Sequence, residues 1–199
     1  MKKIKVAITG GIGAGKSVVS EILEKNGNVV LIADNIAKEL ILNDSQVQRQ
    51  ILKEFGKESF ISGKINTKYL ADKVFNDAVN LQKINKIVHP STMNKIEVLT
   101  KKHFEKTNIV FIETALVFEA GIEDFFDYII LVFAEEKIRI ERTLAREKIS
   151  EAEIRNRMKF QTPDEEKREH VDFVIENNST TDDLEKRCSF ILTILKQLV

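Results

Sequence analysis

The chain has little of what builds disulfides, cysteine-based zinc sites or membrane spans. Cys188 is its single cysteine, which excludes a disulfide framework and a cysteine-based zinc site. No apolar run approaches the roughly 20 residues of a membrane-spanning helix, and the chain enters an expected strand without a signal-peptide pattern. We therefore expect a cytoplasmic protein that does not act on a membrane.

Neither sign of charge is in excess, with 31 basic and 31 acidic residues. Dedicated nucleic-acid binders usually carry a basic excess, so we expect no nucleic-acid partner. Hydrophobic residues make up 43% of the 199 residues, which is enough for a real core in a domain of this size. The sequence does not determine an oligomeric state, and we expect a monomer or a weak homo-oligomer.

Glycine is scarce, yet four of the eight glycines fall within residues 10–15. Residues 10–17 read Gly-Gly-Ile-Gly-Ala-Gly-Lys-Ser, the Gly-x-x-x-x-Gly-Lys-Ser pattern of a loop that binds nucleotide triphosphates. Its glycines let the backbone N–H groups point at phosphates. An ordinary glycine turn is the alternative. It is disfavoured because an expected strand over residues 3–8 precedes the pattern and an expected helix over residues 17–25 follows it.

The pattern assigns roles to its residues. Lys16 brings positive charge to the β- and γ-phosphates, the Ser17 hydroxyl ligates Mg²⁺, and the helix start adds its positive dipole end. We predict that ATP and Mg²⁺ bind here, with Lys16 catalytic and Ser17 the metal ligand. The predicted nucleotide-binding residues of the loop are Gly11, Ile12, Gly13, Ala14, Gly15, Lys16, Ser17 and Val18.

Short apolar strands alternate with helices along the chain. This alternation predicts an α/β protein with a parallel sheet covered on both faces, here a three-layer P-loop fold with five strands. The strands are expected at residues 3–8, 29–33, 109–112, 128–133 and 173–175. Helices are expected at 17–25, 36–55, 67–106 (successive helices broken before His89-Pro90), 135–160 and 181–198, with a polar loop at 57–66.

This organisation suggests a single kinase domain with three parts. The core comprises residues 1–34, 107–134 and 169–199, a helical acceptor-binding region covers 35–106, and a helical lid covers 135–168. Ligands in such folds sit outside the carboxyl ends of the strands. The residues that directly follow an expected strand there are Gly10, Asp34, Glu113 and Asn177.

Three residues outside the loop are candidate substrate contacts, each with a structural alternative. A carboxylate at Asp34 could accept the proton of an acceptor hydroxyl, or it could cap the helix expected at residue 36. Glu113 could be an outer acidic partner of Mg²⁺, or a helix cap. His89 precedes a proline at an expected helix boundary, where a structural role is the commoner outcome for a lone histidine.

Arginine is unevenly placed, because six of the eight arginines lie between residues 139 and 168. Arg139, Arg142 and Arg146 share one helical stripe, and arginine forks bind phosphate oxygens well. We predict that Arg142 and Arg146 close over the nucleotide as part of a lid. A solvated face with glutamate–arginine pairs is the alternative, and we expect it for Arg155 and Arg157.

The sequence lacks an Asn-Lys-x-Asp guanine motif, so a regulatory GTPase does not fit. The ordered set of motifs instead resembles the dephospho-coenzyme A kinase family, over residues 4 to about 195. The residues that carry the resemblance are Thr9–Ser17, Ala33–Lys38, Phe55-Gly56, Gly63–Asn66, Val74-Phe75, Asn85–Pro90, Glu113–Glu119, Glu141–Arg146, Gln161, Lys167-Arg168 and Asp172–Asn177.

The resemblance implies that ATP phosphorylates the 3′-hydroxyl of the dephospho-CoA ribose. It implies that Asp34 is the catalytic base, that Arg142 and Arg146 meet ATP, and that Asn177 lies beside the adenine. It also implies that helices over 36–106 bind the acceptor. The chain departs from the family at Ile32, where an aspartate is usual, and at Thr67, where an arginine is common.

Two other functions fit the same residues. One is a kinase of another nucleoside or small alcohol, and the other is a nucleotide-binding regulator that no longer catalyses. Intact Lys16, Ser17 and Asp34 weigh against the regulator.

Overall fold

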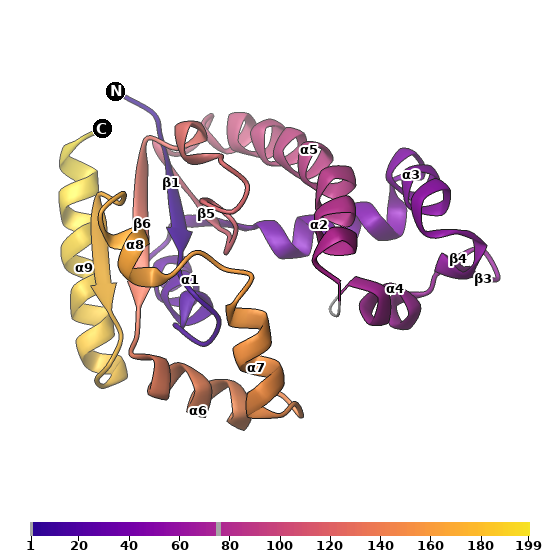
Figure 1. Cartoon of the computed structure of the whole chain (residues 1–199). Helices are drawn as coiled ribbons and strands as arrows, with labels where there is room; N and C mark the ends of the chain where they lie inside the picture. Colours follow the sequence, from indigo (N-terminus) through magenta and orange to yellow (C-terminus); the bar gives the residue numbers. More distant parts are fainter. Residues whose placement is uncertain (1, 75–76) are drawn as a thin grey trace. The chain divides into compact units, whose positions relative to one another are not determined.

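The computed structural model describes residues 2–74 and 77–199, so Phe75 of the Val74-Phe75 motif lies outside the described residues. It contains two compact units (Figure 1). The first comprises Met1–Ile32 with Thr100–Val199, and the second comprises Ala33–Leu99.

The first unit is built on a five-stranded sheet in which every neighbouring pair is parallel, as the sequence predicts. The strand order is β2-β5-β1-β6-β7, so β1 lies at the centre. The strands are β1 (Ile4–Thr9), β2 (Val29–Ile32), β5 (Ile109–Glu113), β6 (Tyr128–Phe133) and β7 (Phe173–Glu176). Register pairs Ile8 with Glu113 and Thr9 with Leu131, so the carboxyl ends of the central strands lie at one edge.

One face of this sheet is covered by α1 (Lys16–Lys25) and α9 (Thr181–Gln197), and it holds the main core. Ile22 of α1 and Leu192 of α9 pack on strand residues such as Ile8. Cys188 belongs to the same core, as expected for a small apolar side chain, and burial raises the pKa of its thiol to about 11. The thiol therefore stays protonated and serves packing.

A smaller apolar cluster covers the other face within this unit. Ala7 and Ile129 of the sheet contact Val117, which lies in the connection after β5. The same connection contains a short 3₁₀ helix, η2 (Glu123–Phe125), and α8 (Asp164–Arg168) contacts β6. This side of the sheet therefore brings residues after β5 and residues after 160 close to the central strands.

The segment expected to be helical over residues 135–160 is two helices. These are α6 (Glu136–Arg146) and α7 (Glu151–Met158). The expected helical segment is interrupted because Ser150 starts a new helix. Its hydroxyl accepts from the Glu153 N–H, and the Glu153 side chain bonds the Ser150 N–H in return, which is the reciprocal capping box.

The second unit, as far as its residues are described, consists of helices and one small hairpin. Its elements are α2 (Ala33–Asn43), α3 (Ser45–Phe55), 3₁₀ helix η1 (Lys57–Ser59), strands β3 (Phe60–Ile61) and β4 (Lys64–Ile65), α4 (Thr67–Val74) and the start of α5 (Ala78–His103). Val47 and Ile51 of α3 pack with Leu70 and Val88 in its core.

Three boundaries in this unit differ from the sequence prediction. The expected helix 36–55 is divided because Asp44 caps α3, accepting from the N–H groups of Gln46 and Val47. The expected loop 57–66 contains the antiparallel β3–β4 pair. Helix α2 begins at Ala33, which places Asp34 in its first turn and not before it.

Helix α5 runs through Pro90, so the predicted break before His89-Pro90 is wrong. A proline inside a helix removes one hydrogen bond and costs about 3 kcal/mol. Val88 is buried in the core of the unit, with Ile84 and Ile87 packed against the same cluster. Burial of such side chains contributes about 1.5–3 kcal/mol each, which is enough to offset the cost.

Candidate nucleotide-binding site

The phosphate loop joins the end of β1 to the start of α1, as the sequence predicts. Gly15 precedes α1 with φ 98°, and Gly13 has φ 75°. These left-handed conformations suit glycine. Lys16 Nζ donates to the carbonyl oxygens of Gly10 (2.8 Å) and Gly11 (3.2 Å), so its ammonium lies over the loop. The first N–H groups of a helix have no intrahelical acceptor, which makes this curl a suitable anion site.

Helix α6 packs directly against the loop at Gly13. A Cβ atom at Gly13 would lie 2.3 Å from the Arg139 carbonyl oxygen and 2.7 Å from Thr143 Oγ1. The Thr143 hydroxyl donates to that same carbonyl at 2.7 Å. Only a glycine permits this approach, so the loop and α6 are matched in shape.

Asn177 contacts the loop from the end of β7. Its side-chain Nδ2 donates to the Ala14 carbonyl at 2.8 Å, and the residue is 6% exposed. Its own carbonyl and side-chain oxygen accept from the Arg142 guanidinium at 3.0 and 3.4 Å. The structure thus brings Arg142, Asn177 and the loop together. The predicted contact of Asn177 with adenine stays a prediction.

Arg146 lies apart from this group. Its guanidinium pairs with Glu147 at 2.7 Å, and its side chain is 61% exposed. Arg155 pairs with Glu136 and Glu151, and Arg157 pairs with Glu147. Arg155 and Arg157 therefore lie in glutamate–arginine pairs, as expected, while closure of Arg142 and Arg146 over a nucleotide stays a prediction.

The donors expected near a metal ion are hydroxyl and carboxylate groups. Ser17 lies in the first turn of α1 and is exposed. Glu113 ends β5, and its carboxylate accepts from the Ser20 hydroxyl of α1 at 2.7 Å. This bond anchors Glu113 to the loop helix, so the helix-cap alternative does not describe its contact. Oxygen donors of this kind suit Mg²⁺.

Asp34 and His89 belong to the second unit. Asp34 is exposed in the first turn of α2, two residues after the end of β2. His89 is half-buried in α5. Burial lowers the pKa of His89, and the charge of Asp34 acts in the opposite direction. The two side chains are therefore close enough to interact electrostatically, which the sequence did not indicate.

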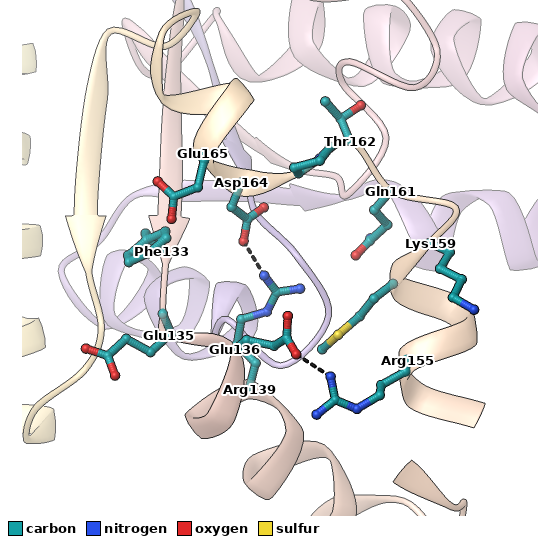
Figure 2. A pocket seen from close by; sticks show the side chains of 13 residues that line it. Phe133, Glu135, Glu136, Arg139, Arg155, Lys159, Gln161, Thr162, Asp164 and Glu165 are labelled. Atoms are coloured by element: carbon teal, nitrogen blue, oxygen red, sulfur yellow. Dashed lines mark hydrogen bonds and ion pairs between the residues drawn. The ribbon is translucent and has the colours of Figure 1, made fainter. Parts of the chain in front are cut away.

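An open cavity of about 710 Å³ lies between α6, α7 and the segment before α8 (Figure 2). Its lining has charged groups of both signs: the carboxylates Glu135, Glu136, Asp164 and Glu165 and the cations Arg139, Arg155 and Lys159. Charges of both signs do not mark this cavity as a phosphate site, so the phosphate site is assigned from the glycine-lysine motif of the loop.

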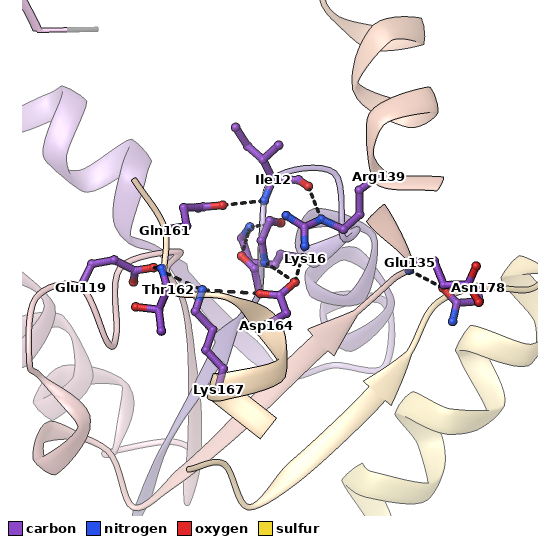
Figure 3. A network of polar contacts seen from close by, with 12 residues as sticks. Ile12, Lys16, Glu119, Glu135, Arg139, Gln161, Thr162, Asp164, Lys167 and Asn178 are labelled. Atoms are coloured by element: carbon purple, nitrogen blue, oxygen red, sulfur yellow. Dashed lines mark hydrogen bonds and ion pairs between the residues drawn. The ribbon is translucent and has the colours of Figure 1, made fainter. Parts of the chain in front are cut away.

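Arg139, Gln161 and Asp164 hold the outer side of the loop, and our sequence analysis assigned none of them to the site. Arg139 donates to the Ile12 carbonyl at 2.9 Å, and Gln161 Oε1 accepts from the Ile12 N–H at 2.9 Å. Asp164 pairs with Arg139 at 2.7 Å (Figure 3). The available signals were the shared stripe of Arg139 with Arg142 and the place of Gln161 in the family resemblance.

Comparison with known proteins gives a consistent picture. The family model for dephospho-CoA kinase matches residues 4–183. A dephospho-CoA kinase of Bacteroides fragilis is 37% identical over 175 residues, covering 88% of this chain and 85% of the relative. The crystal structure of TT1252 from Thermus thermophilus has a TM-score of 0.82 at 30% identity, covering 100% of both chains. The dephospho-CoA kinase from Campylobacter jejuni shares the fold, with a TM-score of 0.72 at 24% identity and 97% coverage of each chain.

Among the described residues, no helix is long and apolar enough to cross a membrane.

Proposed function

The chain belongs to the dephospho-CoA kinase family, and we propose that it transfers the γ-phosphoryl group of ATP to the ribose 3′-hydroxyl of dephospho-CoA, giving coenzyme A. The observation that carries this proposal is the phosphate loop, curled around Lys16 at the end of the central strand, within a chain that matches the family over residues 4–183.

The loop and its neighbours bind the nucleotide in this proposal. Backbone N–H groups at the start of α1 and the Lys16 ammonium receive the phosphate oxygens. Phosphoryl transfer depends mainly on positioning and on charge stabilisation, so a loop held by Asn177 and Arg139 suits the task. Arg142 is next to the loop through Asn177 and is the lid arginine best placed to reach a bound phosphate.

The Ser17 hydroxyl is the protein ligand that would hold Mg²⁺, with Glu113 as the outer acidic group. When bound, the ion neutralises charge on the phosphate oxygens. Glu113 is held by Ser20 on the same helix that presents Ser17, so one helix aligns both groups.

Asp34 is the proposed acceptor of the hydroxyl proton, because it is exposed in the first turn of α2, two residues after β2 ends. His89 is a candidate acceptor contact in the same unit. We further propose the division into a core, an acceptor-binding region over 35–106 and a lid over 135–168, and a cytoplasmic monomer or weak homo-oligomer that acts on a small molecule.

The experiment that tests this function measures ATP turnover by the purified chain with no acceptor and with dephospho-CoA. Adenosine, AMP and shikimate are compared at equal concentration. A product phosphorylated at the 3′-hydroxyl, formed fastest from dephospho-CoA, supports the proposal. A clear preference for a simpler acceptor would leave a kinase of another substrate, and binding of ATP without turnover of any acceptor would indicate a regulator.

A further inference from the structure

Four charged side chains form a buried network behind the phosphate loop (Figure 3). Lys167 Nζ lies 3.2 Å from Glu119 Oε1 and 3.6 Å from Asp164 Oδ1. The other Asp164 oxygen pairs with Arg139 Nη1 at 2.7 Å. The side chains of Lys167 and Asp164 are 0% and 4% exposed, and the network balances two positive charges with two negative ones.

The network meets the loop at Gly11 and Ile12. Arg139 Nε donates to the Ile12 carbonyl at 2.9 Å, and the Gly11 N–H approaches Asp164 Oδ2 at 3.4 Å. A Cβ atom at Gly11 would lie 2.3–2.8 Å from the Arg139 guanidinium. Glycine at position 11 therefore lets the guanidinium lie flat on the loop backbone.

The hydrogen bonds of the Arg139 guanidinium indicate that this side chain holds the loop backbone. Nε is used by the loop carbonyl and Nη1 by Asp164, and the side chain is 11% exposed. A guanidinium fixed on both sides in this way is suited to holding the backbone. Its role differs in this respect from that of Arg142 and Arg146.

A buried ion network is an expensive way to stabilise a fold. Desolvation of each charge costs several kcal/mol, and apolar side chains of similar size often stabilise as well or better. Charged hydrogen bonds do, however, fix direction. Glu119 reaches the network from the connection after β5, and it also accepts from the Thr162 N–H at 2.8 Å. Asp164 is held on one side by its hydrogen bond from Arg139 and on the other by the charge of Lys167, whose Nζ makes no hydrogen bond among the described residues.

We propose that Asp164 is a positioning residue for nucleotide binding. It orients Arg139 and through it the Gly11–Ile12 backbone, while Lys167 and Glu119 keep Asp164 in place. The loop is thus held in its curled form before a nucleotide arrives. Preorganisation of this kind removes an ordering cost from binding. The inference rests on the proposed function only in taking ATP as the nucleotide.

The test measures binding of a non-hydrolysable ATP analogue by calorimetry, together with the KM values of both substrates. Asp164→Asn keeps the shape and removes the charge. Arg139→Lys keeps the buried positive charge and removes the fork that reaches Ile12. Glu166→Gln, an exposed acid on α8, makes the same charge change as Asp164→Asn and is the matched control.

We expect Asp164→Asn and Arg139→Lys to weaken analogue binding about tenfold or more, as for the loss of a hydrogen bond to a charged group. The KM for ATP should rise together with the weaker analogue binding, while the KM for dephospho-CoA should stay within about twofold of wild type. The Glu166→Gln variant should stay within about twofold of wild type in each of these measurements. Arg139→Lys keeps the balance of buried charges, so its analogue binding tests the proposal even if the Asp164→Asn variant unfolds.

Normal analogue binding by a folded Arg139→Lys or Asp164→Asn variant would overturn the proposal. So would unfolding of both variants, because the network would then serve folding alone. Analogue binding does not involve the acceptor, so these outcomes are independent of whether the wild-type chain phosphorylates dephospho-CoA. A wild-type chain that binds the analogue but ignores that acceptor would refute only the proposed function.

Discussion

Asn177 occupies the place that a side chain on Gly15 would need. A Cβ atom at Gly15 would lie 2.2 Å from Asn177 Nδ2, the atom that donates to the Ala14 carbonyl at 2.8 Å. The end of β7 and the last turn of the phosphate loop are therefore one fitted pair, although 162 residues separate them along the chain.

The first prediction concerns this pair. Gly15→Ala should weaken ATP binding strongly, because the methyl group displaces Asn177 and the residue has φ 98°. Asn177→Ala should destabilise folding by about 1–3 kcal/mol, through the unpaired Ala14 carbonyl. The double variant should lose less ATP affinity and less stability than the sum of the losses in the two single variants, because removing the Asn177 side chain relieves the clash. Urea unfolding and binding of an ATP analogue, measured for the wild type, both single variants and the double variant, form a double-mutant cycle. Strictly additive losses would show that the two residues are not coupled.

The second prediction concerns Lys16. Lys16→Ala should lower kcat/KM for ATP by roughly 10²–10³, the range for loss of one electrostatic group in the transition state. Our sequence analysis assigns Lys16 to phosphate, and the structure adds its bonds to the Gly10 and Gly11 carbonyls. A small loss of stability is therefore also expected. Lys25→Ala, an exposed lysine at the end of α1, is the control, and near-normal turnover by a folded Lys16→Ala variant would contradict the assignment.

The third prediction concerns Asp34. Asp34→Asn should lower kcat by roughly 10²–10⁴, the range for a lost general base, with little change in ATP affinity. Glu39→Gln makes the same change at an exposed position of the same helix, and it should be nearly neutral. If ATP binding collapses while residual kcat is normal, Asp34 serves a metal or the helix terminus.

The sequence predicted the sheet and the loop well because both depend on local patterns. A glycine-rich loop between an apolar strand and a helix is recognisable at short range, and all five expected strands match the observed ones within one residue at each end. The breaks it missed depend on specific caps. Asp44 and Ser150 each start a new helix inside a segment that reads as continuous by hydrophobic period.

The part of the site that the sequence could not supply comes from pairing between distant segments. Arg139, Gln161 and Asp164 meet Gly11 and Ile12 across more than 120 positions of the chain. No rule of residue spacing in the sequence predicts contacts between such distant segments. Each of these residues also has an ordinary interpretation as part of a charged helix face or a loop. Only the fold distinguishes them from Arg155, which pairs on an exposed surface.

The fourth prediction concerns the pH dependence of stability. Burial lowers the pKa of His89 from its usual 6.5, so between the lowered value and 6.5 the unfolded chain binds more protons than the folded one. The free energy of unfolding should therefore fall as pH drops below about 6.5. His89→Gln should reduce this slope, and His170→Gln, at an exposed position, should not. Urea titrations between about pH 5 and 7 measure it, and equal slopes for all three proteins would contradict the prediction.

The fifth prediction concerns the proposed lid, residues 135–168, whose two parts are held by contacts of different strength. Near the loop, Arg139 and Asp164 form a buried pair. Farther out, Arg146 and Arg155 make exposed pairs, which are typically worth less than about 1 kcal/mol each. Because these pairs are weak, we expect the outer part, residues 147–158, to change its contacts when a nucleotide binds, although its Ile154 is buried.

We expect an ATP analogue to slow amide exchange and proteolysis over residues 147–158. Exchange near Arg139 and Asp164 should be slow both with and without the analogue, because their network already holds the loop. Hydrogen-exchange mass spectrometry with AMP as a control ligand separates the two parts, since AMP lacks the β- and γ-phosphates that Lys16 and Arg142 are proposed to meet. Equal protection of residues 147–158 in all three states would mean that this segment forms a fixed, solvated surface and does not close over the nucleotide.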